Sequence, residues 1–101
     1  MEQLKILAAG KNKDIMTVID RLINTHENWS GVTVTTTEEA IDTAKEARYD
    51  LLLICAGLSS VEEKELTEEL HTLQPNLRVM RHYGGGSGLL ESEIQSYLKT
   101  I

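Results

Sequence analysis

The chain has 101 residues, the length of one domain, and its 41% hydrophobic and 26% charged residues are typical of a globular protein. The formal net charge of −6 repels phosphate backbones, and Lys and Arg form no cluster, so nucleic acid is not an expected partner. The single cysteine, Cys55, excludes an internal disulfide and a cysteine-pair metal site. Without a leader pattern or an apolar run of ~20 residues, we expect a cytoplasmic protein with no membrane partner.

The first strand–helix pair is clear in the pattern. Residues 4–10 are mostly apolar and end in glycine, which predicts a strand followed by a turn. Asn12 or Asp14 is then in position to cap a helix. The spacing predicts that this helix buries Ile15, Val18, Ile19, Leu22 and Ile23.

A second and a third strand follow. Residues 32–36 alternate and are rich in β-branched side chains, which predicts a strand at the edge of a sheet. Thr37 is the expected cap of a helix over residues 38–47, whose alanines allow close packing. Residues 50–56 form the most apolar run of the chain. A strand apolar on both faces suits the centre of a parallel sheet that helices cover on each side.

The last part of the chain holds one strand between two helical patterns. Residues 60–63 read as a capping box that opens a helix ending at Pro75. That helix is expected to bury Leu66, Leu70 and Leu73. Residues 77–83 predict a fourth strand, and the glycine-rich stretch 84–88 connects it to an amphipathic helix over residues 89–101.

Strand–helix alternation with short connections predicts a single α/β domain over residues 1–101, with parallel strands and right-handed crossovers. The most apolar strands, the first and third, should lie side by side in the centre. The expected fold is therefore a three-layer sandwich with a four-stranded parallel sheet in the order 2-1-3-4. This is a flavodoxin-like arrangement without its fifth strand.

The run Tyr49-Asp50-Leu51-Leu52-Leu53-Ile54 resembles the sequence that leads into the phosphoacceptor aspartate of response-regulator receiver domains. The segments Lys5-Ile6-Leu7 and Thr37-Glu38-Glu39-Ala40 are similar too, and the likeness covers roughly residues 3–83. The resemblance implies a receiver-like signal-transduction module.

The active-site residues of that family do not carry over. On this resemblance, the acidic pair after the first strand falls on Ala8, Ala9 or Gly10, and the phosphoacceptor falls on Cys55. The hydroxyl residue falls near Arg81 or His82, and the lysine-bearing fifth strand is missing. Without these carboxylates there are no oxygen ligands for Mg²⁺, so we expect no metal, no cofactor and no aspartyl phosphorylation.

A ligand or partner crevice in such a sheet lies beyond the carboxyl ends of the first and third strands. The residues expected around it are Gly10, Lys11, Asn12, Gly57, Ser59, His82, Gly84 and Gly85. Cys55 would be a nucleophile there if Lys11 or His82 lowered its pKa. A cysteine that ends an apolar strand is more often a small buried hydrophobe, which is the interpretation we favour. We assign His26, His71 and His82 structural or solvated roles.

The stretch Gly84–Gly88 before a helix would suit a phosphate, but it lacks the spacing of the known phosphate-binding motifs. The alternative is a loop that lets the last helix fold back across the sheet. Gly57-Leu58-Ser59-Ser60 with Gly84-Gly85 also resembles later motif elements of cobalamin-binding domains. Gly10-Lys11-Asn12-Lys13-Asp14 supplies none of their histidine ligand.

The sequence thus predicts a non-catalytic, phosphorylation-independent receiver-like module that binds a protein partner or a second copy of itself. A homodimer would form through the fourth strand or the last helix, with Arg78 and Arg81 protecting the strand edge. The alternative is a small-molecule-binding or redox domain, similar to cobalamin- or nucleotide-binding domains, that uses Cys55 and the Gly84–Gly88 loop.

Overall fold

The computed structural model describes residues 4–25, 27–55 and 57–82. Its elements, in chain order, are β1 (Leu4–Ala9), α1 (Lys13–Thr25), β2 (Trp29–Val34), α2 (Thr37–Glu46), β3 (Leu51–Cys55), α3 (Ser60–Leu73) and β4 (Arg78–His82). The glycine stretch 84–88 and the helix predicted over residues 89–101 lie outside the described residues. No described helix has the length and apolarity that crossing a membrane requires.

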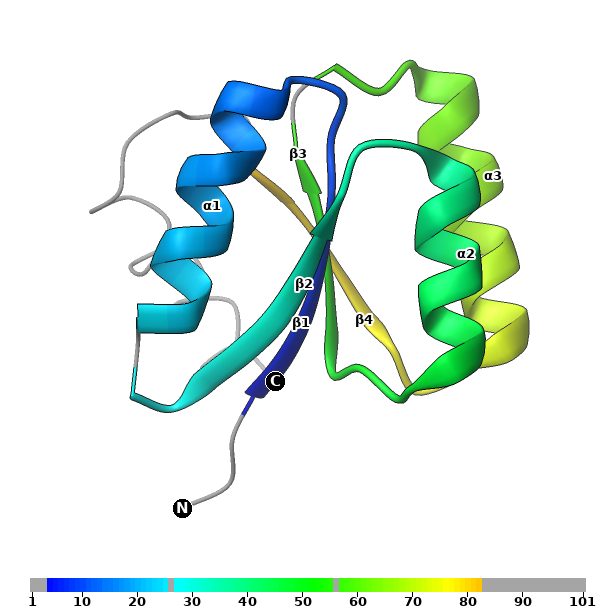
Figure 1. Ribbon diagram of the computed structural model, residues 1–101. Coiled ribbons are helices and arrows are strands. Elements are labelled where there is room, and N and C mark those ends of the chain that lie inside the picture. Colours follow the sequence, from blue (N-terminus) through cyan, green and yellow to red (C-terminus); the bar gives the residue numbers. More distant parts are fainter. Residues whose placement is uncertain (1–3, 26, 56, 83–101) are drawn as a thin grey trace.

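The described strands form one parallel sheet in the order β2-β1-β3-β4, as predicted. Helix α1 covers one face of the sheet, and α2 and α3 cover the other (Figure 1). The result is the three-layer, flavodoxin-like arrangement expected from the sequence. Among the described strands, β2 and β4 are the two edge strands of the sheet.

The core divides into two clusters because successive side chains of a strand point to opposite faces. The α1 face is packed by Ile6, Ala8, Met16, Ile19, Ile23, Trp29, Leu51, Leu53, Cys55 and Met80. The opposite face is packed by Leu7, Ala9, Val34, Ala40, Ala44, Leu52, Ile54, Leu66, Leu70 and Leu77. All five residues of β3 are buried, which is what its two-sided apolar sequence predicts for a central strand.

The second strand was predicted too late: it spans Trp29–Val34 rather than residues 32–36. Gly31 reads as a turn residue, yet it pairs with Ile6 inside the sheet. A Cβ at Gly31 would lie 2.2 Å from the Ile6 carbonyl oxygen, so glycine is what allows this close backbone approach. The Asn24 side chain holds the same residue by bonding both its N–H (3.1 Å) and its carbonyl (3.2 Å).

Two helix caps lie one residue before the predicted ones. The N-cap of α2 is Thr36, whose hydroxyl accepts from Glu39 N–H, and the N-cap of α3 is Ser59, whose hydroxyl accepts from Glu62 N–H. Thr36-Thr37 and Ser59-Ser60 each offer two chemically equivalent caps in succession. The choice is made by the extended backbone of the first member of each pair.

Two side chains predicted to be buried are partly exposed: Val18 at 41% and Leu73 at 40%. Met16, which the sequence analysis left out, is buried instead, so the inward stripe of α1 runs through Met16, Ile19 and Ile23. Leu73 is the last residue of α3, where the helix has passed beyond the sheet. Ile19, Ile23, Leu66 and Leu70 are buried as predicted.

Candidate functional site

At the carboxyl ends of the strands, the connections after β1 and β3 meet. The connection after β1 is fixed by Gly10 N–H, which donates to the Val34 carbonyl (3.2 Å). Asn12 caps α1 as predicted, because its side-chain oxygen accepts from Ile15 N–H (3.1 Å).

Gly57 brings the second connection against the first. Its φ of +104° is a conformation that side chains other than glycine rarely adopt. A Cβ at Gly57 would lie 3.0 Å from the Lys11 Cβ and 3.2 Å from the Lys11 backbone nitrogen. The two connections are therefore in direct contact, and glycine is the residue that permits it.

An ion pair also joins the connection after β1 to the first turn of α3. Lys11 Nζ lies 2.5 Å from Glu62 Oε2, while Glu62 Oε1 accepts from Ser59 N–H (3.1 Å) in the capping box of α3. The hydrogen bond from Lys11, followed by that from Ser59, holds the pKa of the Glu62 carboxyl below its usual range. Lys11 is therefore paired with a carboxylate of its own chain, although its side chain remains 48% exposed.

Cys55 lies beneath this contact, at the end of β3. It is 1% exposed and packs in the apolar cluster on the α1 face. Burial raises the pKa of its thiol to about 12, because the charged thiolate is poorly solvated there. At neutral pH the side chain is a neutral thiol, which is the opposite of an activated nucleophile.

The structure brings together five of the predicted crevice residues on the two touching connections: Gly10, Lys11, Asn12, Gly57 and Ser59. His82 ends β4 and pairs in register with Cys55. Gly84 and Gly85 lie outside the described residues. His71 has a structural contact, since its Nε2 lies 2.9 Å from the Leu77 carbonyl oxygen.

The ends of β1 and β3 carry no carboxylate, since the strands end in Ala9 and Cys55. The acids at this end of the sheet lie instead in the first turns of the helices, where Glu62 is engaged with Lys11 and Ser59. In the part of the chain that the structure describes, no three His, Cys, Asp or Glu side chains gather as a metal site would require. The residues present do not fit a Mg²⁺ ion, which takes oxygen ligands.

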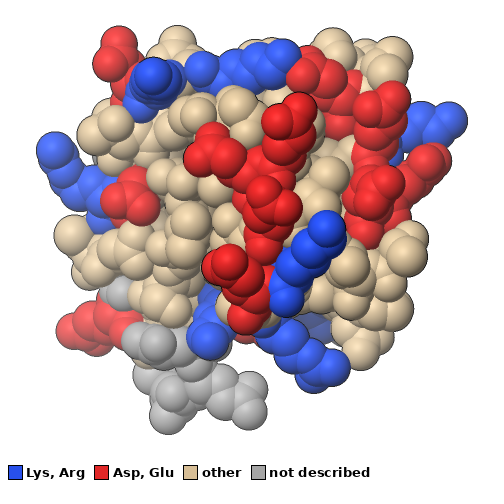
Figure 2. All heavy atoms as spheres, turned by 45° about the vertical axis from the view of Figure 1, so that its right-hand side comes forward, with Lys and Arg blue, Asp and Glu red and all other residues tan. Residues whose placement is uncertain are grey.

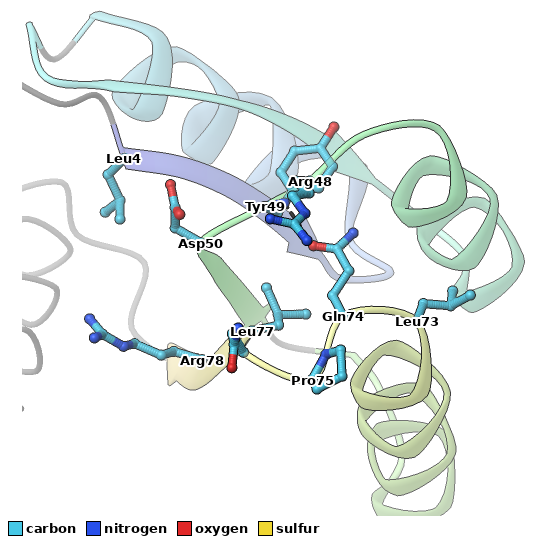
Figure 3. A pocket seen from close by; sticks show the side chains of 10 residues that line it. Leu4, Arg48, Tyr49, Asp50, Leu73, Gln74, Pro75, Leu77 and Arg78 are labelled. Atoms are coloured by element: carbon cyan, nitrogen blue, oxygen red, sulfur yellow. Dashed lines mark hydrogen bonds between the residues drawn. The ribbon is translucent and has the colours of Figure 1, made fainter.

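The amino ends of the strands hold features that the sequence analysis missed. A cavity of about 600 Å³ is lined by Leu4, Arg48, Tyr49, Asp50, Leu73, Gln74, Pro75, Asn76, Leu77 and Arg78 (Figure 3). Its residues come from β1, from the connection between α2 and β3, and from the stretch that runs from the last residue of α3 to the first residue of β4. They are far apart in the sequence, so no local motif reveals the cavity.

Gln74 organises this end. Its Nε2 donates to the carbonyls of Ala44 (2.9 Å) and Ala47 (2.8 Å), and its Oε1 accepts from Tyr49 N–H (2.8 Å). One side chain thereby joins the end of α3 to the end of α2 and the start of β3. Asp50 adds a second link, since its Oδ2 accepts from Lys5 N–H (2.9 Å).

The surface formed by α2 and α3 is acidic. Nine of the 16 acidic residues lie on these two helices. Figure 2 shows bands of acidic side chains on this side of the molecule, separated by uncharged surface.

The sequence matches no protein-family model, and no curated protein matches it either. Solved structures do match. The receiver domain of the hybrid histidine kinase CckA is 14% identical with a TM-score of 0.71, covering 91% of this chain and 96% of that one. A CheY-like response regulator receiver domain protein from Methanospirillum hungatei JF-1 is 20% identical with a TM-score of 0.70, covering 82% of this chain and 66% of that one.

The chemotaxis protein CheY4 of Vibrio cholerae is also similar, at 15% identity and a TM-score of 0.64 over 76% of this chain and 67% of that one. The chain thus spans about two thirds of the length of the two CheY-like proteins. These likenesses show the fold: a CheY-like receiver arrangement on a four-stranded sheet.

Proposed function

We propose that this chain is a receiver-like signalling module that acts through contact with a protein partner and without phosphorylation of an aspartate. The observation that carries the proposal is the chemistry of the carboxyl end of the sheet. Where the resemblance to receiver domains asks for acids, this chain has Ala8, Ala9, Gly10 and a buried thiol. The carboxylates described near that end belong to the first turns of the helices, and two of them are already paired, Glu62 with Lys11 and Glu63 with Arg81.

Phosphoryl transfer to a receiver aspartate needs a carboxylate acceptor and a metal-binding group of oxygens to offset the charge of the phosphoryl group. Cys55 offers neither, because its side chain is a thiol. That thiol is also buried, and burial raises its pKa to about 12, so it is not a thiolate acceptor either. The contact between Lys11 and Gly57 brings the two connections together above this position. The same features oppose the redox alternative, which needs an accessible thiolate.

The test is exposure of the folded protein to acetyl phosphate and Mg²⁺, with intact-mass spectrometry as the readout. We expect no gain of a phosphoryl group, whereas a receiver domain that retains its aspartate should gain one in the same reaction. A phosphorylated species of this chain that hydroxylamine reverses, as it reverses acyl phosphates, would contradict the proposal.

The partner surface that we propose is β4 with the groove beside it. In the five-stranded CheY-like order, a fifth strand lies next to the fourth, whereas β4 ends the described sheet here. A groove of about 960 Å³ runs between β4 and α3 and is lined by Ser60, Glu63, Lys64, Thr67, Glu68, Val79, Met80 and Arg81. The ion pair between Arg81 and Glu63 spans this groove. Our proposed occupant is a second copy of the chain.

A matched pair of variants tests this surface. Thr67 lines the groove on α3, and Thr43 is a comparably exposed threonine on α2. Thr67→Arg should weaken self-association in sedimentation velocity runs over a concentration series, while Thr43→Arg should not. A wild-type protein that remains monomeric at high concentration would contradict the proposal of self-association. It would not affect the proposal that the chain acts without aspartyl phosphorylation.

A further inference from the structure

The cavity at the amino ends of the strands is lined by two arginines whose guanidinium groups have no acceptor among the described residues. Arg48 lies in the connection between α2 and β3, and Arg78 begins β4. Neither guanidinium makes an ion pair or a hydrogen bond with the described residues, although the chain carries 16 acidic residues. In Figure 3 the two side chains lie on different sides of Asp50: Arg48 is beside Tyr49 and Gln74, and Arg78 extends from the start of β4 away from them.

The common structural roles for these arginines are already filled by other groups. An arginine just after a helix often caps its last carbonyls, but Gln74 Nε2 takes those of Ala44 and Ala47. The Leu70 carbonyl accepts from Gln74 N–H, and Lys5 N–H occupies Asp50 Oδ2. Packing alone does not explain the arginines either, since both are exposed.

The wall that carries them is fixed. Three hydrogen bonds of the Gln74 side chain, together with the bond between Asp50 N–H and the Lys5 carbonyl (2.8 Å), hold the backbone on each side. A site held in place in this way binds at a lower entropic cost. The rest of the lining includes the apolar groups of Leu4, Tyr49 and Pro75.

We propose that this cavity binds a small molecule with more than one carboxylate or phosphate group, held by Arg48 on one side of the cavity and by Arg78 on the other, and that the rest of the molecule lies against the remaining wall. Guanidinium groups match the planar oxygen pairs of both anions and bind them through paired hydrogen bonds. The volume of about 600 Å³ is that of small-molecule sites. The site lies at the opposite end of the sheet from the connections around Cys55. The proposal of this site therefore does not depend on the function proposed above, and either can fail without the other.

Titrations with pyrophosphate and with citrate, followed by ¹H–¹⁵N NMR at low ionic strength, test the site and separate the two anion types. We expect saturable shifts of the amides of Asp50, Leu77 and Arg78. Arg48→Gln and Arg78→Gln should each weaken the better probe by about tenfold or more, the worth of a charge-assisted hydrogen bond.

Arg21→Gln is the matched control, because it removes the same charge from the exposed surface of α1. It should leave the affinity unchanged. Asp50→Asn should tighten binding, since it removes a nearby negative charge and retains an oxygen that can accept from Lys5 N–H. Shifts that do not saturate, or an Arg21→Gln variant as weak as Arg48→Gln, would overturn the proposal.

Discussion

The two ends of the sheet are built differently. At the carboxyl end, the connections after β1 and β3 touch through Lys11 and Gly57, and Lys11 forms an ion pair with Glu62. At the amino end, the connections surround a cavity of about 600 Å³, and two guanidinium groups have no acceptor in the part of the chain that the structure describes. In both places short-range polar contacts fix the loops.

This contrast matters because open α/β sheets usually place ligands beyond the carboxyl ends of their strands. Here the fold is kept, but that end has apolar residues and an internal ion pair in place of acids. The amino end has the cavity and the unpaired charge. A fold therefore says where a site is customary, while the residues decide where one is chemically possible.

Replacing Cys55 with aspartate is the change expected to have the largest effect. If the folded protein tolerated this aspartate, the difference that we infer between the two ends of the sheet would be wrong. A carboxylate at a position that is 1% exposed, with no partner cation, should lower the free energy of unfolding by about 3–5 kcal/mol near neutral pH. Burial would raise the pKa of the new carboxyl, so its charged form is disfavoured in the folded protein. The loss should therefore grow as the pH rises through that pKa and shrink in acid.

Urea unfolding at several pH values measures this loss. Cys55→Ser is the control, because it adds a polar group of similar size without a charge and should cost less at every pH. An aspartate variant as stable as the wild type, with no pH dependence beyond that of the serine variant, would mean that the carboxyl end is open to solvent after all.

Replacing Gln74 with alanine probes the amino end and should have the next largest effect. The change removes two donors and one acceptor that join α2, α3 and β3. Since net hydrogen bonds contribute about 1 kcal/mol each, we expect a loss of about 2–3 kcal/mol in the free energy of unfolding. Asn76→Ala, in the same cavity wall, should change stability little, because the Asn76 side chain makes no hydrogen bond with the described residues. Equal losses in both variants would show that Gln74 does not organise this end.

Much of the fold could be predicted from the sequence, because hydrophobic periodicity reports which faces are buried. The run from Leu51 to Cys55 marked the central strand, and the strand order followed from it. The start of the second strand was predicted wrongly because it depends on a contact between residues far apart in the sequence. Gly31 looks like a turn in the sequence, but it allows β2 to approach the backbone of β1.

The candidate sites were predictable to different degrees for the same reason. Gly10, Lys11, Asn12, Gly57 and Ser59 could be placed together because the topology alone puts those connections at one end of the sheet. The partner of Lys11 could not be inferred, since Glu62 reads in the sequence as a capping residue. Gln74 and the two arginines of the cavity have no local motif, and their relation exists only in the folded chain.

Replacing Glu62 with glutamine should have the smallest effect, yet it sharpens the comparison by testing whether the carboxyl end is neutralised internally. The pKa of Glu62 is lowered in the folded protein, first by the hydrogen bond from Lys11. A lowered pKa contributes stability above the ordinary carboxyl pKa, and that contribution is lost as the pH falls through the folded value. The wild type should therefore be slightly more stable than Glu62→Gln near neutral pH, and the difference should disappear in acid. Glutamine can still accept from Ser59 N–H, so the capping contact is retained in both proteins.

Thermal melts from neutral pH to acid, with Glu65→Gln as the control on the exposed surface of α3, measure the difference. High salt should reduce it, because an exposed ion pair is screened. A difference that is independent of both pH and salt would assign the effect to helix capping, and Lys11 would then be a cation available to a ligand at the carboxyl end as well.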